Sequence, residues 1–98
     1  MSTPRVAVIG GGISGLAAAH EVLRLRPDAV VSVYEAASTV GGKLALAEVA
    51  GARIDVGAEA VLTLRPEATD LIAAAGLAQE RLAPLTTAAG VVAGGVLH

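Results

Sequence analysis

The chain has 98 residues, 54% of them hydrophobic, and a formal net charge of −2. This length suits one small domain or part of a larger one, and the charge gives no basic field that would attract nucleic acid. The absence of cysteine excludes disulfides, thiolate metal sites and a cysteine nucleophile. The two histidines, His20 and His98, are far apart in the sequence and predict no metal site.

The first predicted elements form a βαβ unit. Residues 6–9 are a short apolar run that ends in glycines, which predicts a buried parallel strand. Apolar residues at helical spacing predict a helix from about residue 14 to residue 25, ended by Pro27 and Asp28. The β-branched residues at 30–34 predict a second strand, which completes the unit.

A secretory signal peptide is the alternative interpretation of the same N-terminal stretch. Arg5 precedes an apolar run that ends in the small residues Ala17, Ala18 and Ala19. Three adjacent glycines are poor material for the helical part of such a signal, and this favours the strand-and-helix interpretation. No apolar run reaches the roughly 18 residues that span a bilayer. We therefore expect no transmembrane segment and a cytoplasmic protein.

The middle of the chain predicts a hairpin and then a second helix. Residues 44–49 and 52–56 are short strand-like segments with the dipeptide Ala50-Gly51 between them, which predicts the hairpin. Pro66 favours the start of a helix over residues 67–75. Four apolar residues of this region are expected to face a core: Leu62, Leu71, Ile72 and Ala75.

The C-terminal segment predicts a second hairpin. Residues 88–93 and 96–98 flank Gly94 and Gly95, a dipeptide typical of a tight turn. The second arm stops just as it begins. The expected fold is therefore an incomplete α/β domain, in which residues 1–98 form the N-terminal part.

Glycines at the first strand-to-helix corner indicate a dinucleotide site. Gly10, Gly12 and Gly15 fit the pattern G-x-G-x-x-G. Its first glycine permits a tight turn, the second lets backbone approach a pyrophosphate, and the third lets the helix pack closely on the strand. Free N–H groups at the helix N-terminus bind a diphosphate without a lysine. Gly11 adds clearance, and Ser14 either caps the helix, which we favour, or contacts phosphate.

An acidic residue stands at the position that such a site requires. Glu35 lies 20 residues beyond Gly15, at the carboxyl end of the second predicted strand. A carboxylate there accepts hydrogen bonds from both hydroxyls of an adenosine ribose and repels a 2′-phosphate, which disfavours NADP. The alternative is a plain glycine-rich turn followed by an exposed glutamate.

The stretch "YEAASTVGGKLALAEVAGARIDVGAEA" carries a family resemblance. Glu35, five intervening residues and then Gly41, Gly42 and Lys43 resemble the extended FAD-binding motif of the flavin-dependent amine oxidases and their relatives. That group includes protoporphyrinogen and coproporphyrinogen oxidases and phytoene desaturases. The segment "IDVGAEA", residues 54–60, is similar to the porphyrinogen oxidase branch.

This resemblance implies a Rossmann-like FAD-binding domain with FAD as cofactor. The glycine corner would cradle the pyrophosphate, the acid would bind ribose, and the second glycine pair would let backbone pass close to the cofactor, with the lysine near the phosphates. Gly57, Ala58 and Glu59 would lie beside the flavin. The complete implied cofactor-binding set is Gly10, Gly11, Gly12, Ser14, Gly15, Glu35, Gly41, Gly42, Lys43, Gly57 and Ala58. The alternative for the second glycine pair and its lysine is a loop turn with a solvated charge.

Three residues depart from the pattern of the resemblance. Ala45 and Leu46 stand where relatives have a polar or basic pair, and Val61 stands where an aromatic is frequent. These departures concern contacts to flavin and substrate, and they leave the pyrophosphate site intact.

The implied function is that of a porphyrinogen oxidase of haem biosynthesis, in which the porphyrinogen, a small-molecule substrate, is oxidised at the flavin. Within the branch we favour the coproporphyrinogen type. The alternatives are another flavin amine oxidase or phytoene desaturase relative, and a dinucleotide-binding fragment without catalysis. No catalytic residue is evident, and His20 is expected to be a packed or edge residue. We expect the 98-residue chain alone to bind FAD weakly or not at all and to have no turnover.

Overall fold

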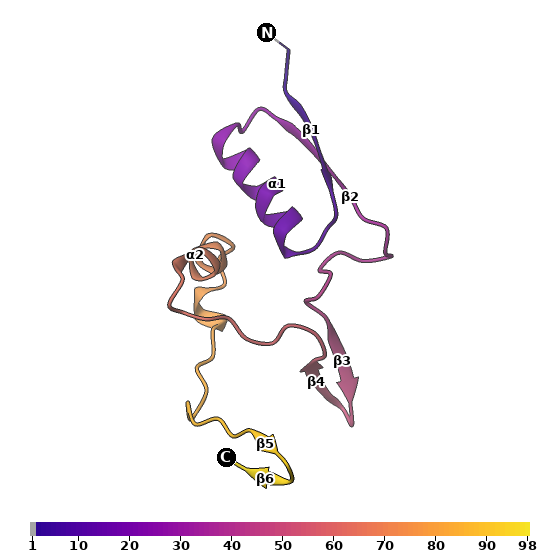
Figure 1. Cartoon of the computed structure of the whole chain (residues 1–98). Coiled ribbons are helices and arrows are strands. Elements are labelled where there is room, and N and C mark those ends of the chain that lie inside the picture. The colour runs from indigo at the N-terminus through magenta and orange to yellow at the C-terminus, as the bar shows by residue number, and fades with distance from the viewer. Residues whose placement is uncertain (1) are drawn as a thin grey trace. The chain divides into compact units, whose positions relative to one another are not determined.

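A computed structural model describes residues 2–98, which divide into two compact units. The first unit ends at Leu62, and the second is Thr63–His98. The predicted α/β class is confirmed, with elements in the expected order (Figure 1). Among the described residues, no helix has both the length and the apolar character needed to cross a membrane.

The first unit begins with the predicted βαβ arrangement. Strand β1 (Arg5–Ile9) leads into helix α1 (Ile13–Leu25), which returns the chain to strand β2 (Val30–Tyr34). The strands pair in parallel, from Arg5 opposite Val30 to Ile9 opposite Tyr34. The helix begins one residue earlier than predicted and ends where predicted.

Helix α1 covers one face of this two-stranded sheet. Val6 and Val8 are half-buried, whereas the residues between and beside them on β1 are exposed, as expected when alternate side chains point to opposite faces. The hydrophobic residues of the described chain that reach full burial are Ala19 in the middle of α1 and Ala29 before β2. Small side chains at these places let the helix lie close to the strands.

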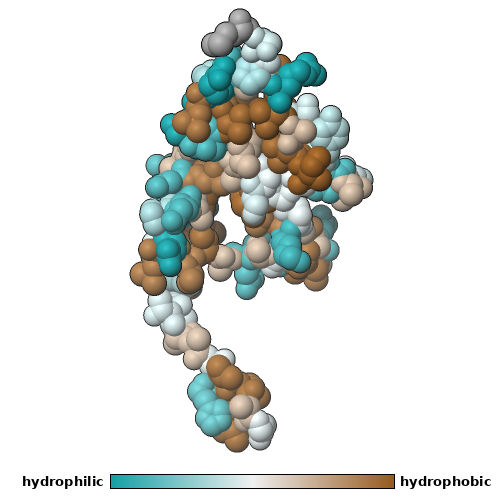
Figure 2. Space-filling model, turned by 45° about the horizontal axis from the view of Figure 1, so that its top comes forward, coloured by the Kyte–Doolittle hydropathy of each residue, from teal (hydrophilic) through white to brown (hydrophobic). Residues whose placement is uncertain are grey.

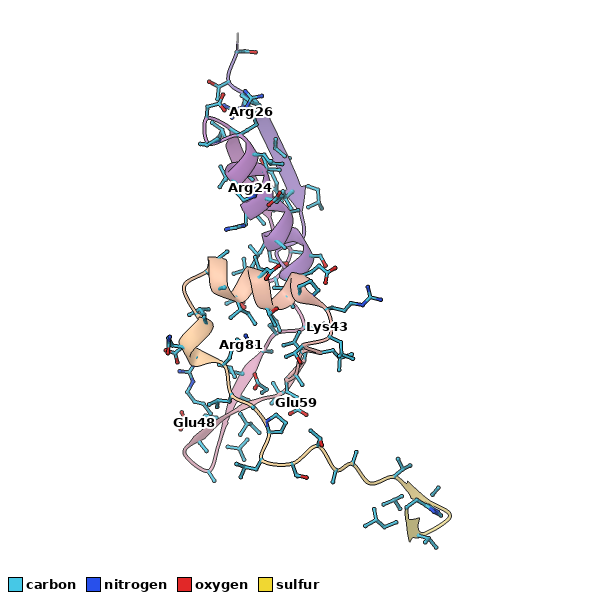
Figure 3. All side chains as sticks on the ribbon, turned by 90° about the vertical axis from the view of Figure 1, so that its left-hand side faces the viewer. Arg24, Arg26, Lys43, Glu48, Glu59 and Arg81 are labelled. Carbon is cyan, nitrogen blue, oxygen red and sulfur yellow. The ribbon has the colours of Figure 1, made fainter. Side chains whose placement is uncertain are left out.

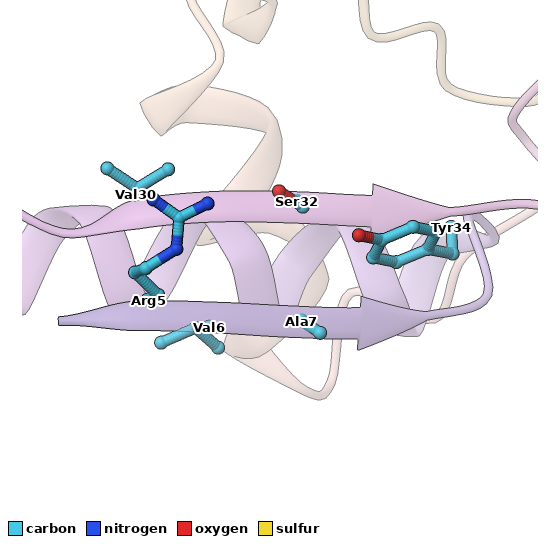
Figure 4. A pocket seen from close by; sticks show the side chains of 6 residues that line it. All are labelled: Arg5, Val6, Ala7, Val30, Ser32 and Tyr34. Atoms are coloured by element: carbon cyan, nitrogen blue, oxygen red, sulfur yellow. The ribbon is translucent and has the colours of Figure 1, made fainter.

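The other face of the sheet is open. Figure 4 shows β1 and β2 side by side with a shallow hollow over them, lined by Arg5, Val6, Ala7, Val30, Ser32 and Tyr34. Ile9 and Tyr34, a cross-strand pair, keep 81% and 59% of their surface exposed. This hollow is separate from the glycine corner described below.

The predicted hairpin is present but shorter than expected. Strands β3 (Leu46–Val49) and β4 (Ala52–Asp55) pair antiparallel. Ala50 has a φ of 51° and Gly51 a φ of 80°, so both central residues of the turn are left-handed, as a type I′ turn requires. The strong right-handed twist of a two-stranded ribbon favours that turn even with alanine in the first position.

The second unit contains helix α2 (Pro66–Ala74), a short 3₁₀ helix η1 (Ala78–Glu80), and the hairpin of β5 (Val92–Ala93) and β6 (Val96–Leu97). The hairpin turns at Gly94 and Gly95, both with positive φ, as predicted. Its arms are shorter than the sequence pattern indicated.

The expected core of the C-terminal region is only partly present. Leu71 and Ile72 are half-buried on α2, whereas Leu62 and Ala75 are exposed. Leu62 lies in the first unit, outside any helix or strand, and α2 buries only part of one face within its own unit, so Ala75 at its end stays exposed. Figure 2 shows hydrophobic residues spread over the surface of the chain.

Candidate functional site

The site is built around the loop of residues 10–12 between β1 and α1. Gly10 has a φ of 103°, a conformation open to glycine and costly for other residues. Its N–H donates to the Tyr34 carbonyl at 2.7 Å, which ties the start of the loop to the end of β2. The predicted role of the first glycine, a tight turn, is therefore seen in the backbone.

Gly15 lies where helix α1 crosses the loop. A Cβ atom at this position would lie 1.8 Å from the Gly10 carbonyl oxygen and 3.3 Å from a methyl group of Val8. Any side chain here would push the helix off the strand. The third glycine thus has the close-packing role that its place in the pattern predicts.

Gly12 is the N-cap residue of α1, in extended conformation with a φ of −76°. Its carbonyl accepts the first helical hydrogen bond, from the Leu16 N–H at 3.0 Å. The amides of Ile13, Ser14 and Gly15 therefore precede the helical ladder and have no acceptor within the helix. Those amides carry the partial positive charge of the helix N-terminus, which favours an anion.

The preferred interpretation of Ser14 as the helix cap is wrong. The cap position belongs to Gly12, and no side chain caps the helix. Because the helix starts at Ile13, Ser14 lies inside its first turn, where its hydroxyl is not placed to accept from the amides two and three residues ahead.

Glu35 turns its carboxylate back toward the glycine loop. Oε1 accepts a hydrogen bond from the Gly11 N–H at 2.9 Å, and Oε2 accepts one from the Ala37 N–H at 2.7 Å. The Ala37 bond and then the Gly11 bond stabilise the ionised form, so the pKa of Glu35 lies below its ordinary value. The carboxylate is charged at neutral pH and faces the corner, as the sequence predicted.

Gly11 is buried and held on three sides. Besides its bond to Glu35, its carbonyl accepts the Gly41 N–H at 2.8 Å. A Cβ at Gly11 would lie 2.9 Å from the Val40 Cγ1 atom and 3.3 Å from the Glu35 Cβ atom. The space left by the missing side chain of Gly11 is thus occupied by the side chains of Val40 and Glu35.

The second glycine pair docks directly on the first. Gly41 forms an isolated parallel bridge with Gly12. A Cβ at Gly42 would lie 3.1 Å from the Gly12 Cα atom, and Gly42 has a φ of 57°. Segments about thirty residues apart in the sequence therefore meet with bare backbone on both sides.

Gly57 and Ala58 lie against the lysine that follows this pair. A Cβ at Gly57 would lie 1.9 Å from the Lys43 carbonyl oxygen, and the Ala58 N–H donates to that oxygen at 2.7 Å. The absence of a side chain at Gly57 is thus required by contact within the chain. The side chains of Lys43 and Glu59 are both exposed (Figure 3).

The structure joins most of the predicted residues into one connected arrangement and adds two that the sequence did not indicate. Val40 packs against Gly11, and the Ala37 amide helps to orient Glu35. Neither has a sequence signal, because one is an ordinary apolar residue and the other contributes only its backbone.

Comparisons with known proteins agree with this geometry. Residues 8–75 match the family described as "NAD(P)-binding Rossmann-like domain". The chain is 41% identical over 83 residues to a coproporphyrinogen III oxidase of Mycobacterium tuberculosis, an alignment that covers 83% of this chain and 18% of the relative. It is 40% identical over 86 residues to protoporphyrinogen oxidase 2, chloroplastic/mitochondrial, of Arabidopsis thaliana, covering 88% of this chain and 16% of that protein.

A solved structure shares the arrangement as well. The crystal structure named "Putative protoporphyrinogen oxidase", from Exiguobacterium sp. 255-15, superposes with a TM-score of 0.72 at 39% identity. The match covers 81% of this chain and 18% of that one. The chain thus spans less than a fifth of the length of each of these three relatives.

Proposed function

Because the chain belongs to the family of NAD(P)-binding Rossmann-like domains, we propose that its glycine corner binds the dinucleotide FAD as part of a porphyrinogen oxidase. In this proposal the loop of residues 10–12, Ser14 and Gly15 receives the diphosphate, and Glu35 receives the adenosine ribose. Residues 1–98 are the N-terminal part of the FAD-binding domain.

The observation that carries the proposal is the direction of the Glu35 carboxylate. It points at the glycine loop, with Oε1 2.9 Å from the Gly11 nitrogen. A carboxylate offers about four acceptor positions, and two are used by backbone amides here. The remaining positions suit the two hydroxyls of a ribose, and the negative charge disfavours a ribose that carries a 2′-phosphate.

The corner also offers room for a diphosphate. A Cβ at Gly12 would meet no atom closer than the Gly42 Cα at 4.0 Å, so the space beside this backbone is clear. The amides at the start of α1 supply donors without a lysine. FAD bound here would supply the redox chemistry, accepting hydride equivalents from a substrate.

The second glycine pair and the segment that follows it are proposed to border the same cofactor. Gly41 and Gly42 bring bare backbone to the edge of the diphosphate site, and the exposed ammonium of Lys43 supplies positive charge near it. Gly57 and Ala58 are tied to the backbone of Lys43, which supports their assignment to the same cofactor environment.

The choice of a porphyrinogen as substrate rests on the relatives. The porphyrinogen oxidases named above match more than four-fifths of this chain. A second candidate is a polyamine oxidase, because polyamine oxidase 1 of Oryza sativa subsp. japonica is 50% identical over 56 residues. That match covers only 56% of the chain, so we favour the porphyrinogen.

The cofactor assignment is tested by titration followed at individual amides. ¹⁵N-labelled protein is titrated with FAD, NADH and NADPH, a method that detects the weak binding we expect. FAD is expected to shift the Gly11, Gly12 and Ser14 amide signals more than either nicotinamide nucleotide, and Glu48→Ala, an exposed control on β3, should bind as the parent does. A stronger response to NADH or NADPH than to FAD at these amides would overturn the assignment.

A further inference from the structure

Three parts of the first unit meet at a single residue, Gly11, through the two peptide groups on either side of its α-carbon. The Gly11 N–H donates to Glu35 at 2.9 Å, and the Gly11 carbonyl accepts the Gly41 N–H at 2.8 Å. Val40 packs over its α-carbon. One residue of the phosphate loop therefore joins the acid at the end of β2 to the second glycine pair.

This connection restrains a segment that would otherwise be very free. Gly11 stands between two further glycines, and a run of three glycines loses more backbone entropy on ordering than any other tripeptide. A hydrogen bond to an ionised carboxylate is stronger than one to a neutral acceptor. The Glu35 bond is thus well suited to fix the backbone at Gly11.

We propose that Glu35 is a positioning residue, which fixes the backbone of Gly11 through its N–H and thereby orients the Gly11 carbonyl that holds the Gly41–Gly42 turn against the loop. The role is exerted before any nucleotide arrives, because both bonds lie within the chain. It deepens the proposed function and rests on it, since the acid that binds ribose also shapes the neighbouring phosphate site.

The two roles of Glu35 separate in the ligand-free protein. A residue that only binds ribose leaves the backbone unchanged when it is replaced. A positioning residue affects the Gly41 N–H, which bonds to the Gly11 carbonyl in the next peptide group along the loop. Glu35→Gln keeps one acceptor oxygen for the Gly11 N–H, whereas Glu35→Ala keeps none.

The test is amide hydrogen exchange in the full chain without ligand. Two amides are compared: Gly41 and Arg26, whose N–H bonds to the Val22 carbonyl at the far end of α1 and reports changes remote from the glycine loop. In Glu35→Ala we expect the Gly41 amide to exchange at least about tenfold faster than in the parent, with Arg26 little changed. Glu35→Gln should restore most of the protection, and Glu48→Ala should change neither amide.

The outcomes separate the two proposals. Unchanged Gly41 exchange in Glu35→Ala, or equal acceleration at Gly41 and Arg26, would overturn the positioning role. Faster exchange at Gly41 alone supports it. If the loop amides of the parent respond more strongly to NADH than to FAD while Gly41 responds selectively to Glu35→Ala, the choice of FAD fails and the positioning role at the dinucleotide site stands.

Discussion

The replacement Gly15→Ala tests whether the packing of helix α1 against the glycine loop requires the absence of a side chain at this position. Ordinary contact begins near 3.4 Å, and the new methyl group would lie only 1.8 Å from the Gly10 carbonyl oxygen. The helix must therefore move by roughly 1.6 Å, because the obstructing atom belongs to the backbone and no rotamer relieves the clash. Overpacking of a well-fitted contact costs about 1–3 kcal/mol. For a clash this close we expect the upper end, about 3 kcal/mol.

The assay is urea unfolding followed by circular dichroism, with Gly12→Ala as the matched control. Gly12 lies in the same loop, but its φ is −76° and its nearest obstruction is 4.0 Å away. Alanine there is expected to change the free energy of unfolding by no more than about 1 kcal/mol. If both variants unfold at the same urea concentration as the parent, the close-packing argument for Gly15 is refuted.

Further predictions concern the cofactor, the acid and two turns. Gly12→Ala should lose FAD binding while keeping its unfolding midpoint, and equal FAD affinity would count against phosphate approach at this loop. The backbone hydrogen bonds that lower the pKa of Glu35 stabilise the fold above about pH 4.5, and this stabilisation is lost as the pH falls through the lower pKa of the folded state. The difference in unfolding midpoint between Glu35→Gln and the parent should therefore shrink from pH 7 to pH 3. Gly57→Ala should destabilise the first unit by about 2 kcal/mol or more, because its methyl group would lie 1.9 Å from the Lys43 carbonyl oxygen; near-parental thermal unfolding would contradict this. Ala50→Asn should raise the free energy of unfolding by about 1 kcal/mol, because asparagine adopts the left-handed conformation of this position at lower cost than alanine. A lower free energy of unfolding, measured with urea, would contradict the assigned turn.

Local patterns were sufficient to predict the β1–α1–β2 unit and the glycine corner within it. The apolar run before Gly10 and the helical spacing after Gly15 locate β1 and α1, since strand and helix periods differ clearly there. Glu35 was predicted for this site from its spacing to Gly15 and its place at the carboxyl end of the second strand, and its carboxylate does bond to the glycine loop.

Contacts that depend on tertiary approach could not be predicted in this way. Ser14 is a favoured cap residue by type, but a helix starting at Ile13 leaves the cap to Gly12. At Gly57 the sequence did not indicate that the bare α-carbon is required by the Lys43 carbonyl within the chain. Leu62 is apolar yet exposed, because burial depends on what packs over a residue and not on its type alone.

The open face of the β1–β2 sheet gives the protein a built-in optical reporter. Tyr34 is the chain's single aromatic residue, it lies half in solvent on that face, and it directly precedes the acid that faces the glycine loop. Ultraviolet emission from the unmodified polypeptide therefore comes from one known place. A molecule that covers this sheet changes the surroundings of Tyr34, and the event can be followed by fluorescence without attaching a dye.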